Sequence, residues 1–136
     1  MEVISLHGTD DRLYQLVARL VMDPDVLRQN NNYPFKTTSE YVWHLCVGDD
    51  GGVVGFLPVK ATDRGFYIDN YYVGGDEQAV LGLLIGHVLL QTTRPVTILA
   101  HKRHSQTLKG HGFITSTVFA QYNRMQCVRR IGDDGR

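Results

Sequence analysis

The sequence predicts an α/β (α+β) domain: a mixed, mostly antiparallel sheet with one parallel crossover and helices on both faces. Two β-prone runs flank the turn signal at 49–52, as the strands of an antiparallel hairpin do. A long apolar run at 76–91 lies between two strand-like segments, which is the pattern of a parallel crossover. A chain of 136 residues without a linker or repeat suits a single domain, 1–136.

The composition excludes several classes of protein. Lys plus Arg equals Asp plus Glu at 14 each, so no overall charge attracts nucleic acid or an anionic membrane. The N-terminus lacks the charged start and apolar run of a signal peptide, and the apolar stretch 79–90 is too short to span a bilayer. Cys46 and Cys127 are isolated and are expected to be buried, reduced thiols. We therefore expect a cytoplasmic protein with no nucleic-acid or membrane partner.

The first third of the chain is expected to form a strand and two helices. Residues 2–6 are short, apolar and β-prone. Thr9 can then cap a helix whose first turn holds Asp10 and Asp11. The core side of that helix is formed by apolar residues at helical spacing: Leu13, Leu16, Val17 and Leu20. Pro24 opens a second short helix that ends near Gln29, and 30–35 reads as a loop that could face a substrate.

The middle of the chain is expected to form three antiparallel strands, 41–47, 53–59 and 66–73, joined by the turns at 49–52 and 63–65. In a regular strand, alternate residues share a face. Along 66–73 this rule places Tyr67, Asp69, Tyr71 and Val73 on one face and Ile68, Asn70 and Tyr72 on the other.

The last third supplies the crossover and the end of the sheet. Gly74 and Gly75 break the third strand before the helix at 76–91, and Arg94-Pro95 precede a buried-looking strand at 96–100. A short helix at 105–109, a Gly-His-Gly break and a final strand around 118–128 follow. Ligands of open α/β sheets bind where crossover strands diverge, near the N-terminus of the crossover helix.

Two segments of this layout resemble the GNAT family of acyl-CoA-dependent N-acyltransferases. Tyr67-Ile-Asp-Asn-Tyr-Tyr-Val73 looks like the family's fourth strand, which offers backbone groups to the pantetheine arm of the coenzyme. Leu108-Lys-Gly-His-Gly-Phe113 looks like its Tyr-x-x-x-Gly-Phe segment. The resemblance implies a GNAT-like fold and transfer of an acetyl group from acetyl-CoA to a primary amine of a small molecule or peptide. It also suggests a homodimer.

The resemblance implies a set of residues that contact the coenzyme: Tyr71, Tyr72, Val73, Gln78, Ala79, Val80 and Gly82. The stretch 74–82 that would hold the diphosphate is short, and it contains Asp76 and Glu77. These carboxylates either cap the helix or repel the diphosphate. Leu108 stands where many family members have a tyrosine that protonates the departing thiolate, and a leucine cannot donate a proton.

Two residues are candidates for catalysis. Asp69 lies in the middle of the predicted third strand and could accept a proton from the attacking amine, or it could be an ordinary strand residue. Tyr122 lies on the last strand and could replace the missing proton donor if its hydroxyl reaches the cleft, although a packed tyrosine is the commoner outcome.

Histidines and basic residues cluster between 101 and 111: His101, Lys102, Arg103, His104, Lys109 and His111. They could form a basic rim for the phosphates of the coenzyme, with His104 as a contact, or merely a solvated basic helix. No cysteine or carboxylate accompanies the histidines at ligand spacing, so we expect no metal.

A second hypothesis remains open beside acyl transfer. The domain could be a catalytically impaired GNAT-like module that serves binding or regulation. This hypothesis predicts that the coenzyme slot is filled by side chains, or closed between Tyr72 and the strand 96–100.

Overall fold

The computed structural model describes residues 1–128, which form an eight-stranded sheet in the order β1-β2-β3-β4-β6-β8-β7, with β5 paired to β3 beside this path. The strands are β1 (Glu2–His7), β2 (Tyr41–Val47), β3 (Val53–Thr62), β4 (Gly65–Ile68), β5 (Tyr72–Val73), β6 (Val96–His101), β7 (Ile114–Val118) and β8 (Tyr122–Cys127). Among the described strands only β4 and β6 pair in parallel. The predicted mixed sheet with one parallel crossover is therefore confirmed.

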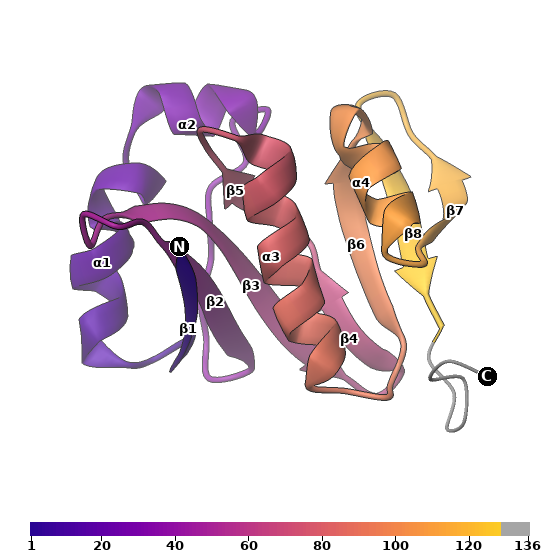
Figure 1. The fold of residues 1–136 in the computed structure, drawn as a ribbon, viewed down its shortest axis with the longest axis horizontal. Coiled ribbons are helices and arrows are strands. Elements are labelled where there is room, and N and C mark those ends of the chain that lie inside the picture. Colours follow the sequence, from indigo (N-terminus) through magenta and orange to yellow (C-terminus); the bar gives the residue numbers. More distant parts are fainter. Residues whose placement is uncertain (129–136) are drawn as a thin grey trace.

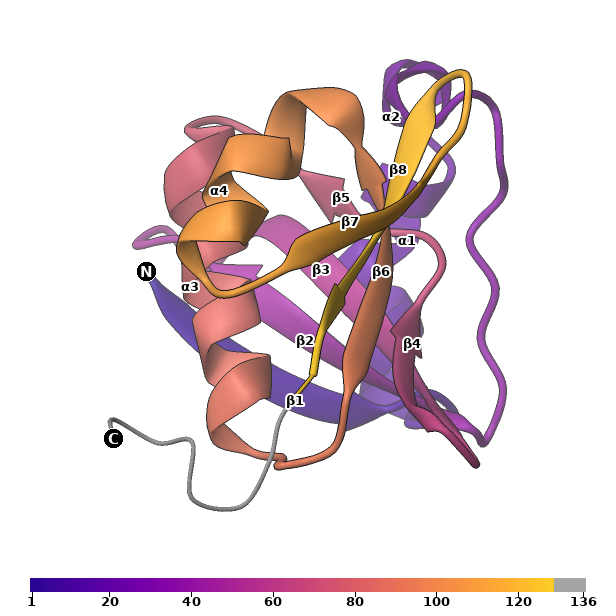
Figure 2. The ribbon, with the colours of Figure 1, turned by 90° about the vertical axis from the view of Figure 1, so that its right-hand side faces the viewer.

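Helices cover both faces of the sheet, as predicted (Figures 1 and 2). The helices α1 (Asp11–Val21) and α2 (Pro24–Gln29) lie on one side, and α3 (Glu77–Leu90) and α4 (Ser105–Gly110) lie on the other. A 3-10 turn, Lys102–His104, joins β6 to α4. One hydrophobic core lies between the sheet and α3, and a second lies under α1 around Trp43 and Phe56. No helix within the described part of the chain is long and apolar enough to cross a membrane.

The predicted N-cap of α1 is wrong by one residue. Asp10, not Thr9, has the extended backbone of an N-cap and accepts a hydrogen bond from the backbone N–H of Arg12. A carboxylate satisfies an unpaired helical N–H as a threonine hydroxyl does, and its charge also favours the helix dipole.

The predicted strand 66–73 is in fact two strands, β4 and β5, separated by Asp69–Tyr71. Both pair antiparallel with β3, but only β4 continues to β6, where Ile68 pairs with Ile98. The interruption also shifts the alternation of faces: Ile68, Tyr71 and Val73 are buried, whereas Asp69 is exposed. Tyr71 therefore does not share the face of Asp69 as a regular strand would require.

The predicted final strand around 118–128 corresponds to β8, and the strand before it, β7, was not predicted. The antiparallel pair of β7 and β8 turns at residues 119–121, and β7 forms one edge of the sheet. The register of the pair shifts between Thr115 and Thr117, so Ser116 lies at a bulge. A bulge bends its strand and re-aims the neighbouring side chains.

Gly55 offers a test of how tightly β3, β5 and α3 pack. A Cβ atom at this position would lie 2.7 Å from Cγ1 of Val80 and 3.0 Å from the carbonyl oxygen of Tyr72. We expect Gly55→Ala to lower the free energy of unfolding by about 1–3 kcal/mol, because the core must shift to admit the methyl group. Urea denaturation would measure this. Gly110→Ala in α4 is the control, since a Cβ there meets no atom within 4 Å; an equal loss in both variants would contradict the packing argument.

Candidate active site at the divergence of β5 and β6

The candidate site lies where β5 and β6 separate, beside the N-terminus of α3. Only Gly74, Gly75 and Asp76 join β5 to α3. Gly75 adopts a φ of 61°, a conformation that glycine reaches without strain, and this permits the sharp turn into the helix. Asp76 is the N-cap, and its carboxylate accepts a hydrogen bond from the backbone N–H of Ala79 at 3.2 Å. The capping interpretation of Asp76 is therefore confirmed.

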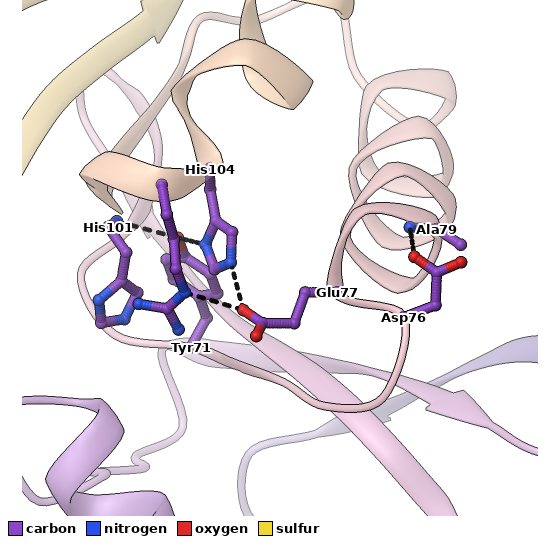
Figure 3. A network of polar contacts seen from close by, with 7 residues as sticks. Tyr71, Asp76, Glu77, Ala79, His101 and His104 are labelled. Atoms are coloured by element: carbon purple, nitrogen blue, oxygen red, sulfur yellow. Dashed lines mark hydrogen bonds and ion pairs between the residues drawn. The ribbon is translucent and has the colours of Figure 1, made fainter.

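A chain of hydrogen bonds crosses the site from β6 to α3 (Figure 3). The backbone N–H of His101 donates to the hydroxyl of Tyr71 at 3.1 Å, and that hydroxyl lies 2.7 Å from Nδ1 of His104. On the other side of the ring, Nε2 of His104 lies 2.7 Å from Oε1 of Glu77, which also accepts a hydrogen bond from Nε of Arg103 at 2.9 Å. Glu77 thus does more than stabilise the helix end, because it ties α3 to the segment after β6.

The protonation states of Tyr71, His104 and Glu77 are consistent with these hydrogen bonds. Burial raises the pKa of the Tyr71 hydroxyl, so it stays protonated and can donate. Burial lowers the pKa of His104 although the Glu77 carboxylate opposes this, so the ring is neutral at pH 7. Burial alone would raise the pKa of Glu77, but the hydrogen bonds from His104 and Arg103 outweigh it and lower the pKa. A neutral ring that accepts at Nδ1 from Tyr71 and donates from Nε2 to Glu77 satisfies every partner.

These side chains fill the slot between β5 and β6. Tyr71 is 1% exposed, and its ring packs against His101 at 5.2 Å and His104 at 5.6 Å between ring centroids. The space that they share with α2 and Arg103 has no room for a water molecule. In this conformation the slot therefore does not fit the pantetheine arm of acetyl-CoA.

The other predicted coenzyme contacts are spread around this point. Tyr72 is half-buried and packs on Phe56 on the far side of the sheet, while Val73 and Val80 belong to the core. Gln78 and Ala79 are exposed in the first turn of α3, and Gly82 lies beside His111. His104 is only 2% exposed, so it does not lie on a solvated helix surface, and its contact with the coenzyme stays a prediction. Its ring is turned inward by hydrogen bonds to Tyr71 and Glu77, two partners that the sequence pattern did not connect with it.

The two predicted catalytic residues, Asp69 and Tyr122, line one pocket of about 520 Å³ on the opposite face of the sheet from α3. The hydroxyl of Tyr41 donates to Oδ2 of Asp69 at 3.3 Å. The hydroxyl of Tyr122 accepts from the side chain of Asn31 at 2.8 Å. We call this cavity the acceptor-side pocket; its full lining is Tyr33, Pro34, Lys36, Asp69, Asn70, Leu99, Phe119, Tyr122 and Arg124.

Asn30, which the sequence analysis passed over, holds the wall of this pocket in place. It is 2% exposed, and its side-chain amide donates to the side chain of Asn70 and to the carbonyl of Tyr33. These bonds attach the loop after α2 to the break between β4 and β5. Nothing in the run Asn30-Asn-Asn distinguishes the buried asparagine from its exposed neighbours.

The fold corresponds to that of the GNAT acyl-CoA N-acyltransferases. The chain superposes on ElaA of Escherichia coli with a TM-score of 0.72 at 18% identity, over 93% of this chain and 99% of that one. An acyl-CoA N-acyltransferase from Pseudomonas aeruginosa gives 0.69 at 14% identity, over 94% and 100%. An aminoglycoside 6'-acetyltransferase type Ii gives 0.62 at 13% identity, over 94% and 97%. The predicted GNAT-like fold is therefore confirmed. No family model and no curated protein matches the sequence.

The buried histidines make stability depend on pH. Burial lowers the pKa of His44 and of His101 from 6.5 to about 4, and it lowers that of His104. Below pH 6.5 the unfolded chain binds protons that the folded chain does not, so the free energy of unfolding should fall between pH 7 and 4.5, by about 1 kcal/mol or more for each of His44 and His101.

Urea denaturation across this pH range measures the effect. His101→Gln should reduce the slope, and His7→Gln, at an exposed strand position, should leave it unchanged. A free energy of unfolding that stays constant from pH 7 to 4.5 would contradict the assignment of neutral, buried rings.

Proposed function

We propose that the domain is an N-acetyltransferase that moves an acetyl group from acetyl-CoA to a primary amine. The observation that carries the proposal is the placement of Asp69 and Tyr122 in one pocket, next to the point where β5 and β6 separate. The GNAT-type fold supports it. A cytoplasmic location and a homodimer stay predictions.

The residues of the acceptor-side pocket can supply the proton transfers of this reaction. The carboxylate of Asp69, directly or through a water, takes a proton from the ammonium group, and the free amine then attacks the thioester carbonyl. The C–N bond forms, the C–S bond breaks, the nitrogen releases its second proton as the amide forms, and the thiolate takes up a proton. Tyr122 is the candidate donor, and its hydroxyl is held by Asn31 and the backbone of Asn30. General acid–base catalysis of this kind increases the reaction rate by roughly 10²–10⁴-fold.

The role of Asp69 can be tested by the release of free thiol from acetyl-CoA with a panel of primary amines. Asp69→Asn should lower kcat/KM by roughly 100-fold or more, because the amide cannot accept the proton. Asp63→Asn in the exposed turn after β3 is the matched control and should behave like the wild type. Equal rates in Asp69→Asn and wild type would exclude Asp69 as the base.

The filled slot favours a second candidate function, the catalytically impaired module for binding or regulation. Tyr71, His101 and His104 occupy the place between β5 and β6, and the short turn 74–76 presents few free N–H groups to a diphosphate. The N–H of Ala79 is bonded to the Asp76 carboxylate and that of Val80 to the Asp76 carbonyl. We call the three side chains in the slot, Tyr71, His101 and His104, the plug. Acyl transfer requires the plug to open so that the coenzyme can enter, whereas the module hypothesis requires it to stay closed.

Tyr71→Phe separates these two functions. The substitution keeps the ring but removes the hydroxyl that joins His101 to His104, so the plug is held less firmly. If acetyl-CoA binds by displacing these side chains, its affinity measured by calorimetry should rise roughly 2–10-fold, since a hydrogen bond contributes about 0.5–1.5 kcal/mol net. Tyr14→Phe, on the exposed surface of α1, should leave the affinity unchanged. No binding at millimolar acetyl-CoA by either the wild type or Tyr71→Phe would favour the module.

A further inference from the structure

A second cavity adjoins the acceptor-side pocket along the sheet. This neighbouring cavity measures about 420 Å³ and shares Arg124 with the first. It lies over β4, β6, β8 and β7, and its other lining residues are Thr62, Arg64, Gly65, Phe66, Tyr67, Thr97, Ser116 and Gln126. The two cavities therefore adjoin on the face of the sheet opposite α3, with Arg124 in the wall of both, and we call them together the groove.

The charges in this groove are unequal. Its lining contains the cations Lys36, Arg64 and Arg124 but only one carboxylate, that of Asp69. Within residues 1–128, none of the three cations forms a salt bridge. One carboxylate can pair with one ammonium group, and the excess positive charge attracts an anion.

The Arg124 side chain is oriented by an aromatic ring, and its backbone is anchored in the sheet. Its guanidinium lies over the ring of Phe119, 5.3 Å from the ring centroid. The backbone of Arg124 pairs with Leu99 of β6 and Thr117 of β7, and its carbonyl accepts a hydrogen bond from Ser116 at the bulge. A guanidinium stacked by one face keeps its N–H edge free for a bidentate contact with a carboxylate or phosphate.

Asp69 and Arg124 act on the same part of the groove. Both influence the hydroxyl of Tyr67: burial raises the pKa of this group, the Asp69 carboxylate raises it further, and the Arg124 guanidinium opposes the rise. The apolar walls of the acceptor-side pocket come from Leu99, Phe119 and the tilted pair of Tyr33 and Tyr122, whose ring centroids are 6.4 Å apart. The pocket thus offers an anion, a cation and aromatic surface to one ligand.

We propose that the acceptor is an amine that also carries an oxyanion, a carboxylate or a phosphate, with its ammonium at Asp69, its oxyanion at Arg124 and its apolar part against Tyr33, Phe119 and Tyr122. That this ligand is the acyl acceptor rests on the proposed acyl transfer. The ligand class itself follows from the groove and can be tested without coenzyme.

The test compares amines that differ only in the oxyanion. Calorimetry at low salt would use phenylalanine against phenethylamine for the carboxylate, and phosphoethanolamine against ethanolamine for the phosphate. We expect the anionic member of at least one pair to bind roughly 10-fold or more tightly than its neutral partner, and the pair that shows the preference identifies the oxyanion. The preference should weaken in 0.5 M salt, because the groove is open to solvent.

Arg124→Met should abolish this preference, and Arg124→Lys should retain part of it. Arg94→Met is the matched control, because Arg94 also stacks on an aromatic ring, that of Phe66, but donates to the carbonyls of Thr62 and Asp63 and lines neither cavity. Asp69→Asn should weaken both members of a pair alike. Unfolding midpoints close to wild type would show that the variants are folded.

The outcomes separate this inference from acyl transfer. Equal binding of both members in each pair, absence of binding by all four amines at millimolar concentration, or a preference that survives Arg124→Met would overturn the inference. Anion-dependent binding without thiol release from acetyl-CoA would support the inference and contradict the proposed acyl transfer. Thiol release from acetyl-CoA without any preference for anionic amines would support acyl transfer and overturn the inference.

Discussion

The site depends on the point at which β6 stops pairing with its neighbour. β3 pairs with both β4 and β5, whereas β6 pairs with only β4 of these two strands, as far as Ile68 and Ile98. Past that point, backbone groups of β5 and β6 that would bond to each other in a continuous sheet face a gap, and buried polar groups of the backbone need partners. The hydroxyl of Tyr71 provides one such partner, because it accepts a hydrogen bond from the backbone N–H of His101. The break at Asp69–Tyr71 also sends Asp69 to one face of the sheet and Tyr71 to the other.

The charges near α3 follow from this arrangement. A carboxylate at the start of a helix is favoured by the helix dipole, but the partly buried Glu77 needs partners of its own. His104 and Arg103 supply them from the segment that follows β6. The side chain of His104, which satisfies Glu77, also fills the slot between β5 and β6. The closed slot and the paired Glu77 carboxylate therefore have the same cause. On the opposite face, Lys36, Arg64 and Arg124 form no salt bridge within residues 1–128, and all three line the groove.

Local patterns in the sequence predict most of the fold, and contacts between distant residues account for what they miss. The hairpin of β2 and β3, the apolar α3 and the crossover to β6 each follow from a run of adjacent residues. The break between β4 and β5 does not, because Asp69-Asn70 fits an alternating strand as well as an interruption, and the choice depends on β6 and on Asn30. β7 was missed since Ile-Thr-Ser-Thr-Val lies mostly exposed at an edge and shows no alternation of polar and apolar residues. Asp69 and Tyr122 could be named as candidates, but not the pairing of Glu77 with His104, 27 positions apart.

The parallel pair of β4 and β6 has a consequence for the order of folding. The pairs β2–β3, β3–β4 and β7–β8 join neighbouring segments of chain, whereas β4 reaches β6 only after α3 has crossed over, with Phe66 paired to Val96. Pairings between distant residues form slowly, because the intervening chain must be ordered before the contacts are made. Both the plugged slot and the cationic groove lie across this junction. We therefore expect the residues of the slot and the groove to come together late in folding, after the hairpins and α3 have formed.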